Sequence, residues 1–242
     1  MQSHVSLAAV VFDMDGLLLD SERVSQEVLL KAARILGAPL TPETALKMVG
    51  RNVESGYRYL TELFGDEKTV TPFLEKAHEL YEAEFEAGRI PLKTGVTQLL
   101  DTLDELKIPR AIATSTRRHI AIRKLTKVAI VTRFDHIIGG DDVVNGKPAP
   151  DIYLKACSYL GVEPTNSLAC EDSAFGIQAA FTAGLRSILI PDLLTPTEAM
   201  KRHAWKILPD LHEVEKLVRE MRNASESCLL YTSPSPRDQR GS

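Results

Sequence analysis

The sequence of 242 residues lacks the patterns that mark several large protein classes. Its three cysteines, Cys157, Cys170 and Cys228, follow no disulfide or metal-binding spacing, so a reducing cytoplasm is the expected compartment. No apolar run approaches the roughly 20 residues that a membrane span needs, and no secretory signal is expected. The formal net charge of −4 argues against a nucleic-acid partner. Nothing in the sequence indicates an oligomeric state.

The composition is that of an ordinary globular protein, with 44% hydrophobic and 26% charged residues. The length suits one large domain or two smaller ones. Residues 228–242 stand apart, because the composition changes abruptly after a charged helical pattern. The first eleven of them resemble the translation of a transposon-based sequencing adapter, so we expect a non-native tail and leave it out of the functional argument.

An apolar run and two aspartates open the chain. Residues 8–12 read as a buried strand, and Asp13 and Asp15 follow it. Side chains two residues apart on an extended chain point the same way, so we expect both carboxylates to face one spot, with Gly16 permitting a turn. Two carboxylates aimed at one point repel unless a proton or cation separates them, and Mg²⁺ is the natural partner for oxygen ligands.

The residues between 21 and 90 show helical patterns and no strand pattern, which predicts a small all-helical insert. Its last helix is expected to begin at Thr71-Pro72. Elsewhere, apolar strand patterns alternate with amphipathic helical ones, which predicts an α/β fold with a doubly wound parallel sheet. The predicted division is therefore a core of residues 1–20 and 91–227 with an insert of residues 21–90. The predicted strands after the first are 109–113, 136–138, 167–170, 186–190 and 205–208.

Polar residues follow several of these strands at the edge where ligands bind in such sheets. Thr114 ends the second strand, Glu171 and Asp172 end the fourth, and Lys147 lies at a helix opening. Each of these residues has an ordinary structural role when taken alone, such as a helix cap or a solvated surface lysine. Together they supply what one reaction needs, namely a nucleophile, a cation site and a second positive charge.

The order of these residues resembles the four motifs of the haloacid dehalogenase superfamily. The stretch Asp-Met-Asp-Gly-Leu-Leu-Leu-Asp-Ser-Glu and the later Gly-Lys-Pro-Ala-Pro-Asp are similar to subfamily IA, in its sugar-phosphatase and β-phosphoglucomutase-like branch. The resemblance implies a Rossmann-like core, a mobile α-helical cap formed by the insert, and a Mg²⁺ cofactor. It also implies site roles, with catalytic residues Asp13, Asp15, Thr114 and Lys147 and metal-binding residues Asp13, Asp15, Glu171 and Asp172.

The implied reaction is hydrolysis of a phosphomonoester through an aspartyl-phosphate on Asp13. Asp15 would protonate the leaving group and then activate water, which requires a raised pKa. Ser115, Gly16 and Arg51 are the candidate substrate-binding residues, and Arg51 is equally well read as a solvated arginine. The expected partner is a small phosphorylated metabolite, either a sugar phosphate or a nucleoside phosphate.

Three alternatives remain beside the phosphatase. Family mutases of the phosphoglucomutase type carry a histidine in the first cap helix, where this chain has Ser25, and that departure favours hydrolysis. A signalling receiver domain also gathers acidic residues, a hydroxyl and a lysine around Mg²⁺, but receivers are shorter and lack the helical insert. A non-catalytic phosphate-binding protein on the same fold disagrees with the presence of both Asp13 and Asp15.

Overall fold

The architecture is described from a computed structural model, which covers residues 7–51 and 53–231, with the backbone alone for residues 225–231. One six-stranded sheet, parallel throughout, has the order β3-β2-β1-β4-β5-β6. Strands β1 and β4 lie side by side at its centre, where the strand order reverses, so the predicted doubly wound α/β fold is confirmed. The strands are β1 (Ala9–Phe12), β2 (Arg110–Ala113), β3 (His136–Ile138), β4 (Ser167–Glu171), β5 (Arg186–Leu189) and β6 (Lys206–Ile207).

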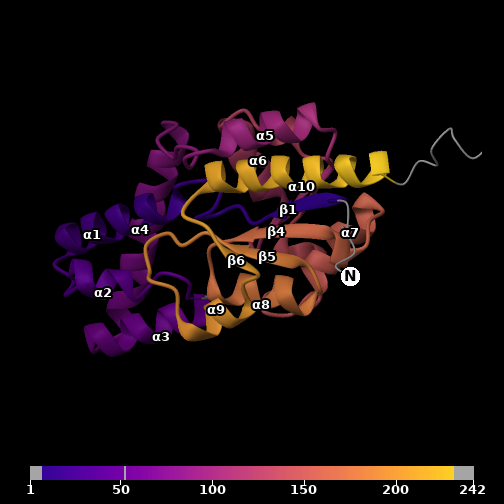
Figure 1. Ribbon diagram of the computed structural model, residues 1–242. Helices are drawn as coiled ribbons and strands as arrows, with labels where there is room; N and C mark the ends of the chain where they lie inside the picture. The colour runs from indigo at the N-terminus through magenta and orange to yellow at the C-terminus, as the bar shows by residue number, and fades with distance from the viewer. Residues whose placement is uncertain (1–6, 52, 232–242) are drawn as a thin grey trace, which may run out of the picture.

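Helices cover both faces of the sheet (Figure 1). Val10 and Phe12 point into one hydrophobic core and Val11 into the other, as the alternation of a strand requires. The first core is covered by helices α5 (Val96–Glu105), α6 (Arg118–Lys127) and α10 (Leu211–Tyr231). The second is covered by α7 (Asp151–Leu160) and α8 (Ala174–Thr182), with α9 (Glu198–His203) beside α8.

The insert forms a bundle of four helices at one end of the sheet, which confirms the predicted helical insert (Figure 1). It has a hydrophobic core of its own, in which the Phe64 and Phe73 rings meet edge to face at 5.1 Å. The predicted boundaries at residues 20 and 91 stay a prediction, because Val24, Val28 and Phe85 of the insert pack into the core of the sheet domain. The helices are α1 (Ser21–Leu36), α2 (Pro42–Leu46), α3 (Val53–Phe64) and α4 (Glu67–Glu86).

The two chain segments that join the bundle, or cap, to the sheet domain run side by side. Leu19 and Leu92 form an antiparallel bridge, the Asp20 amide donates to the Pro91 carbonyl at 2.9 Å, and the Lys93 amide donates to the Leu18 carbonyl at 2.9 Å. This paired crossing fixes where the cap meets the carboxyl ends of the strands.

Helix α4 begins at Glu67, so the predicted start at Thr71-Pro72 is wrong. The Asp66 side chain accepts from the Lys68 amide at 3.0 Å and caps the helix, which places Pro72 inside it. A proline there removes one backbone hydrogen bond, and burial of the neighbouring Val70 and Phe73 offsets that loss.

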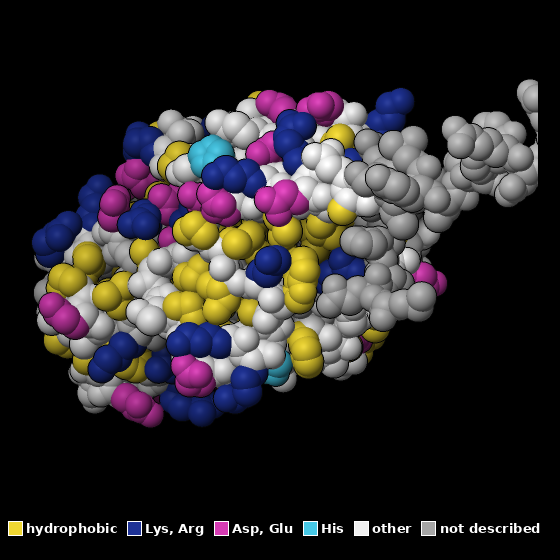
Figure 2. Space-filling view, viewed as in Figure 1, with side chains coloured by type: hydrophobic (Ala, Val, Ile, Leu, Met, Phe, Trp, Pro, Cys, Tyr) yellow, Lys and Arg dark blue, Asp and Glu magenta, His cyan; other side chains and the backbone are white. Residues whose placement is uncertain are grey.

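The far end of the chain also departs from expectation. Helix α10 continues through residue 231, past its predicted end near Met221, so residues 228–231 of the predicted tail are helical and residues 232–242 lie outside the described residues. No helix in the described part of the chain is long and apolar enough to cross a membrane. Trp205 and Ile207, at the edge strand β6, are 45% and 43% exposed. Figure 2 shows apolar side chains gathered near the middle of the face drawn there.

Candidate active site

A cleft of about 400 Å³ lies between the carboxyl ends of the central strands and the cap. The cap contributes residues 48–51, and the sheet domain contributes Lys147, which precedes α7, and the loops that follow β1, β2, β4 and β5. The predicted site residues that line it are Asp13, Asp15, Arg51, Thr114, Ser115, Lys147 and Asp172. Residues from five separate parts of the chain therefore meet at the edge where the sequence placed them.

Asp13 lies directly after β1, and its amide donates to the Cys170 carbonyl of β4 at 3.0 Å. The residue is only 8% exposed. Its Oδ1 accepts from the Lys147 ammonium at 2.6 Å. Burial raises the pKa of Asp13 from 3.8 to about 7, against the attraction of Lys147, which acts to lower it.

Lys147 bridges Asp13 and Glu171, with its Nζ 2.6 Å from an oxygen of each. Its side chain is 5% exposed. Although burial acts to lower the pKa of Lys147, the two carboxylates raise it above its ordinary value. The lysine is therefore a fixed positive charge inside the cleft and not a solvated surface residue.

Glu171 is fully buried at the end of β4, and donors surround both of its oxygens. Oε1 accepts from Lys147 and from the Tyr153 hydroxyl at 2.7 Å. Oε2 accepts from the Asp172 amide at 3.1 Å and from the amide and hydroxyl of Ser173. With five donors in place, this carboxylate holds both Lys147 and the turn that carries Asp172.

Asp13, Glu171 and Asp172 form an acidic group whose ligand oxygens lie within 4.8 Å of one another. Asp172 Oδ1 is buried and has no hydrogen-bond partner among the described residues. Burial, together with the charges of Asp13 and Glu171, raises the pKa of Asp172 well above its ordinary value. An unpartnered buried oxygen among like charges fits a cation, and an all-oxygen donor set suits Mg²⁺.

Gly16 shapes the wall of this acidic group. Its φ of +85° is left-handed, and a Cβ at this position would overlap Asp172 Oδ2. The turn that the sequence assigned to Gly16 is therefore present, and it keeps the backbone close to the acidic group.

The Asp15 side chain is paired with donors outside the acidic group of Asp13, Glu171 and Asp172. Its Oδ1 accepts from the Lys124 ammonium at 2.7 Å and from the Ser21 hydroxyl at 3.0 Å, and its Oδ2 accepts from the Thr116 hydroxyl at 2.7 Å. Although burial acts to raise the pKa of Asp15, Lys124 and these hydrogen bonds lower it below its ordinary value. The raised pKa expected for Asp15 is therefore absent, and its carboxylate stands apart from the group of Asp13, Glu171 and Asp172 because Lys124, Ser21 and Thr116 hold it.

The remaining predicted residues differ in how firmly they are held. Thr114 is 1% exposed, and its hydroxyl accepts from the Thr116 amide at 3.1 Å. Ser115 is exposed at the cleft. Arg51 is an exposed cleft residue whose Nε donates to the Lys47 carbonyl at 2.6 Å and whose guanidinium lies 4.7 Å from the centre of the Tyr59 ring.

Sequence reasoning missed Lys124, Thr116 and Tyr153, which contact the predicted residues directly. Thr116 lies two residues after Thr114, and the same strand-end argument could have found it. Lys124 and Tyr153 lie inside helices, where a lysine is ordinarily solvated and a tyrosine ordinarily belongs to the core. Only the packing of those helices shows what the two side chains reach.

Comparison with known proteins agrees with this geometry. Residues 10–190 match the model of the haloacid dehalogenase-like hydrolases. The chain is 32% identical over 182 residues to a phosphorylated carbohydrates phosphatase of Thermotoga maritima. The aligned region covers 75% of this chain and 84% of that protein.

Two solved structures extend the similarity to the fold. A putative β-phosphoglucomutase from Thermotoga maritima is 29% identical, with a TM-score of 0.75 over 88% of this chain and 98% of that one. A hydrolase from Deinococcus radiodurans, solved with bound phosphate and sodium, is 25% identical, with a TM-score of 0.75 over 90% of this chain and 97% of that one.

Proposed function

Because the chain belongs to the haloacid dehalogenase-like hydrolases and is a phosphatase of that family, we propose that it hydrolyses a small phosphorylated metabolite through an aspartyl-phosphate intermediate. The observation that carries this proposal is the Lys147 ammonium held between Asp13 and Glu171, beside the unpartnered oxygen of Asp172. A buried carboxylate, a fixed ammonium and an unpartnered carboxylate oxygen in one cleft support the proposal of a nucleophile, a positive charge and a cation site there.

Asp13 is the proposed nucleophile. Its carboxylate attacks phosphorus, the bond to the leaving oxygen breaks, and water later hydrolyses the acyl phosphate to release phosphate. Lys147 lies beside the attacking oxygen, where it offsets the repulsion between two anions and stabilises charge on the phosphoryl oxygens. Thr114 and Ser115 are proposed to donate hydrogen bonds to those oxygens, because both line the cleft next to Asp13.

The proposed cofactor is Mg²⁺, held by Asp13, Asp172 and the main-chain carbonyl of Asp15. When bound, it supplies positive charge that neutralises the phosphoryl oxygens. Glu171 belongs to the same acidic group. Because its oxygens already accept five hydrogen bonds, it is proposed to hold Lys147 and the turn that carries Asp172 in place. Gly16 is proposed to keep room for the bound phosphate and metal.

Asp15 is proposed to act as the general acid and base. It lies in the cleft two residues after the nucleophile and is free of the acidic group around Asp172. In the first half-reaction it would give a proton to the leaving oxygen, and in the second it would take one from water.

The proposed substrates are phosphate monoesters of sugars or nucleosides. The similar protein of Thermotoga maritima is a phosphatase of phosphorylated carbohydrates. Arg51 reaches the cleft from the cap and is proposed to contact the substrate beyond its phosphate. Hydrolysis is favoured over phosphoryl transfer between sugar positions because Ser25 stands where family mutases carry a histidine. The match over residues 10–190 gives no support to the receiver-domain or non-catalytic alternatives.

The proposal is tested with Asp13→Asn and a panel of sugar, glycerol and nucleoside phosphates. The wild-type protein is expected to release phosphate in Mg²⁺ and to stop in excess chelator. Asp13→Asn is expected to keep its fold by circular dichroism and to lose turnover. Turnover in chelator would remove the metal from the mechanism, and turnover by Asp13→Asn would remove Asp13 as the nucleophile. Interconversion of sugar phosphates without phosphate release would favour the mutase.

A further inference from the structure

Three donors from separate elements converge on the Asp15 carboxylate. Ser21 begins the first cap helix, Thr116 follows β2, and Lys124 lies on α6. Lys124 is the only charged group among these three, and its Nζ is 2.7 Å from Asp15 Oδ1. The Lys124 side chain is 13% exposed, so its charge is held largely out of water beside the carboxylate.

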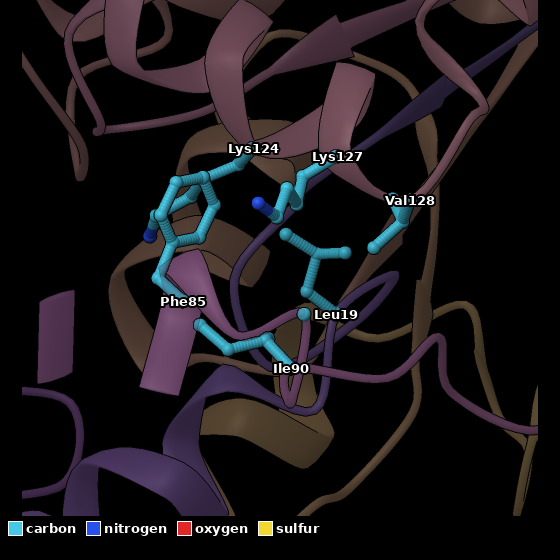
Figure 3. A pocket seen from close by; sticks show the side chains of 7 residues that line it. Leu19, Phe85, Ile90, Lys124, Lys127 and Val128 are labelled. Atoms are coloured by element: carbon cyan, nitrogen blue, oxygen red, sulfur yellow. The ribbon is translucent and has the colours of Figure 1, made fainter. Parts of the chain in front are cut away.

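Lys124 also touches the cap. Its ammonium lies 5.4 Å from the centre of the Tyr81 ring on α4, within range of a cation–π contact. The residue lines a small pocket at the junction of the cap and the sheet domain, together with Leu19, Phe85 and Ile90 (Figure 3). Lys124 therefore joins Asp15, the sheet domain and the last cap helix at one point.

The neighbouring Lys127 provides a natural comparison. It lies on the same helix and lines the same pocket, as Figure 3 shows. Its ammonium is 3.4 Å from Glu86 and 5.9 Å from the centre of the Phe85 ring. In the described part of the chain Lys127 thus pairs with the cap alone, whereas Lys124 pairs with the cap and with Asp15.

We propose that Lys124 is a positioning residue, which holds the Asp15 carboxylate in register for proton transfer and ties its position to the cap. The inference rests on the proposed function, because it assigns a partner to the proposed acid and base. Removal of Lys124 leaves two neutral hydroxyl donors on a carboxylate that has Glu22 and Asp13 nearby. Misplacement of a reacting group by about 1 Å costs roughly 100-fold in rate.

The test compares Lys124→Met and Lys127→Met on two substrates. One is p-nitrophenyl phosphate, whose leaving group departs readily without a proton. The other is the sugar or glycerol phosphate that the wild-type enzyme hydrolyses fastest, whose alkoxide needs one. The quantity compared is kcat/KM, which reports phosphoryl transfer to the nucleophile.

For Lys124→Met we expect kcat/KM on the alkyl phosphate to fall about 10- to 100-fold, the lower range of a general acid's contribution, with a change below about threefold on the aryl phosphate. Lys124→Arg is expected to recover part of the loss, because it restores a positive charge. Lys127→Met is expected to stay near the wild-type value on both substrates.

Two outcomes would overturn the assignment of Lys124. One is wild-type kcat/KM for Lys124→Met on the alkyl phosphate. The other is an equal loss on both substrates, which would indicate a structural role. Circular dichroism and the thermal midpoint show whether the variant is folded. Failure of the proposed function looks different, because the wild-type enzyme would then hydrolyse neither substrate in Mg²⁺.

Discussion

Replacement of Lys147, whose ammonium is buried in the cleft, should destabilise the protein as well as inactivate it. Lys147 is 5% exposed and is the lysine that neutralises Asp13 and Glu171, each at 2.6 Å. In Lys147→Met, the buried carboxyl groups of Asp13 and Glu171 and the partly buried one of Asp172, whose ligand oxygens lie within 4.8 Å of one another, would lose the ammonium beside them. Breaking a buried ion pair by removing one partner costs about 3–5 kcal/mol.

A loss of that size is measurable by heat or denaturant. For a chain of 150–250 residues, about 1 kcal/mol shifts the midpoint by roughly 2–4 °C, so Lys147→Met should melt about 6–20 °C below the wild type in chelator. The loss should shrink at lower pH, where protons neutralise the carboxyl groups, and in Mg²⁺, the proposed cofactor, whose binding would stabilise the folded state.

Lys216→Met is the matched control for this prediction. Lys216 pairs with Glu213 at 2.6 Å, but both side chains are exposed, at 63% and 40%. Exposed pairs contribute about 0–1 kcal/mol, so this variant should unfold nearly as the wild type does. Urea unfolding followed by circular dichroism in chelator measures both variants. A loss below about 1 kcal/mol for Lys147→Met would refute the view that Lys147 neutralises the acidic group.

Three further predictions follow from the same site. Because burial raises the pKa of Asp13 from 3.8 to about 7, the folded state binds a proton that the unfolded state has released, so metal-free protein should lose stability as the pH rises between those values. Urea unfolding in chelator at pH 5.5 and 8 tests this, and greater stability at pH 8 would contradict it. Tyr153→Phe removes a buried hydrogen bond to Glu171 and should cost about 1–3 kcal/mol in the free energy of unfolding, measured by urea; no change would show that the bond contributes nothing. Gly16→Ala should weaken Mg²⁺ binding in calorimetry, because its Cβ would overlap Asp172, whereas Gly37→Ala has a similar positive φ and an open surrounding and should bind Mg²⁺ normally.

The sequence predicted those parts of the site that follow from strand ends. Asp13, Thr114 and Asp172 each come just past the carboxyl end of a parallel strand, and such ends meet at one edge of a sheet. Lys147 is different, because it lies on a loop before α7 and only its motif indicated a role. Contacts made by residues inside helices left no pattern of that kind, since a helix can rotate or slide to bring many side chains to the same edge.

The predicted start of α4 was wrong for a related reason. Pro72 looks like a helix start, because proline is common in the first turn. In the structure Asp66 caps α4 five residues before Thr71, and the helix continues through the proline. The apolar side chains of Val70 and Phe73, on either side of the proline, are fully buried. Local preference predicted the wrong start because tertiary burial of the first turn outweighs the loss of one backbone hydrogen bond.

The opposite pKa shifts of Asp13 and Asp15 show what the surroundings add to a motif. Both residues are aspartates two positions apart, yet burial among carboxylates raises one pKa while Lys124 and two hydroxyls lower the other. As it stands, the cleft favours an anionic Asp15, which suits the second half-reaction, where a base must take a proton from water. The first half-reaction, as proposed, needs a protonated Asp15. In the proposed mechanism, a substrate dianion entering beside Asp15 would act against Lys124 and raise the pKa of Asp15, so the substrate itself would supply the charge that prepares the acid. In the proposed mechanism, hydrolysis of the acyl phosphate would then follow with Asp15 returned to Lys124, and one carboxylate would serve both steps because its electrostatic surroundings would change between them.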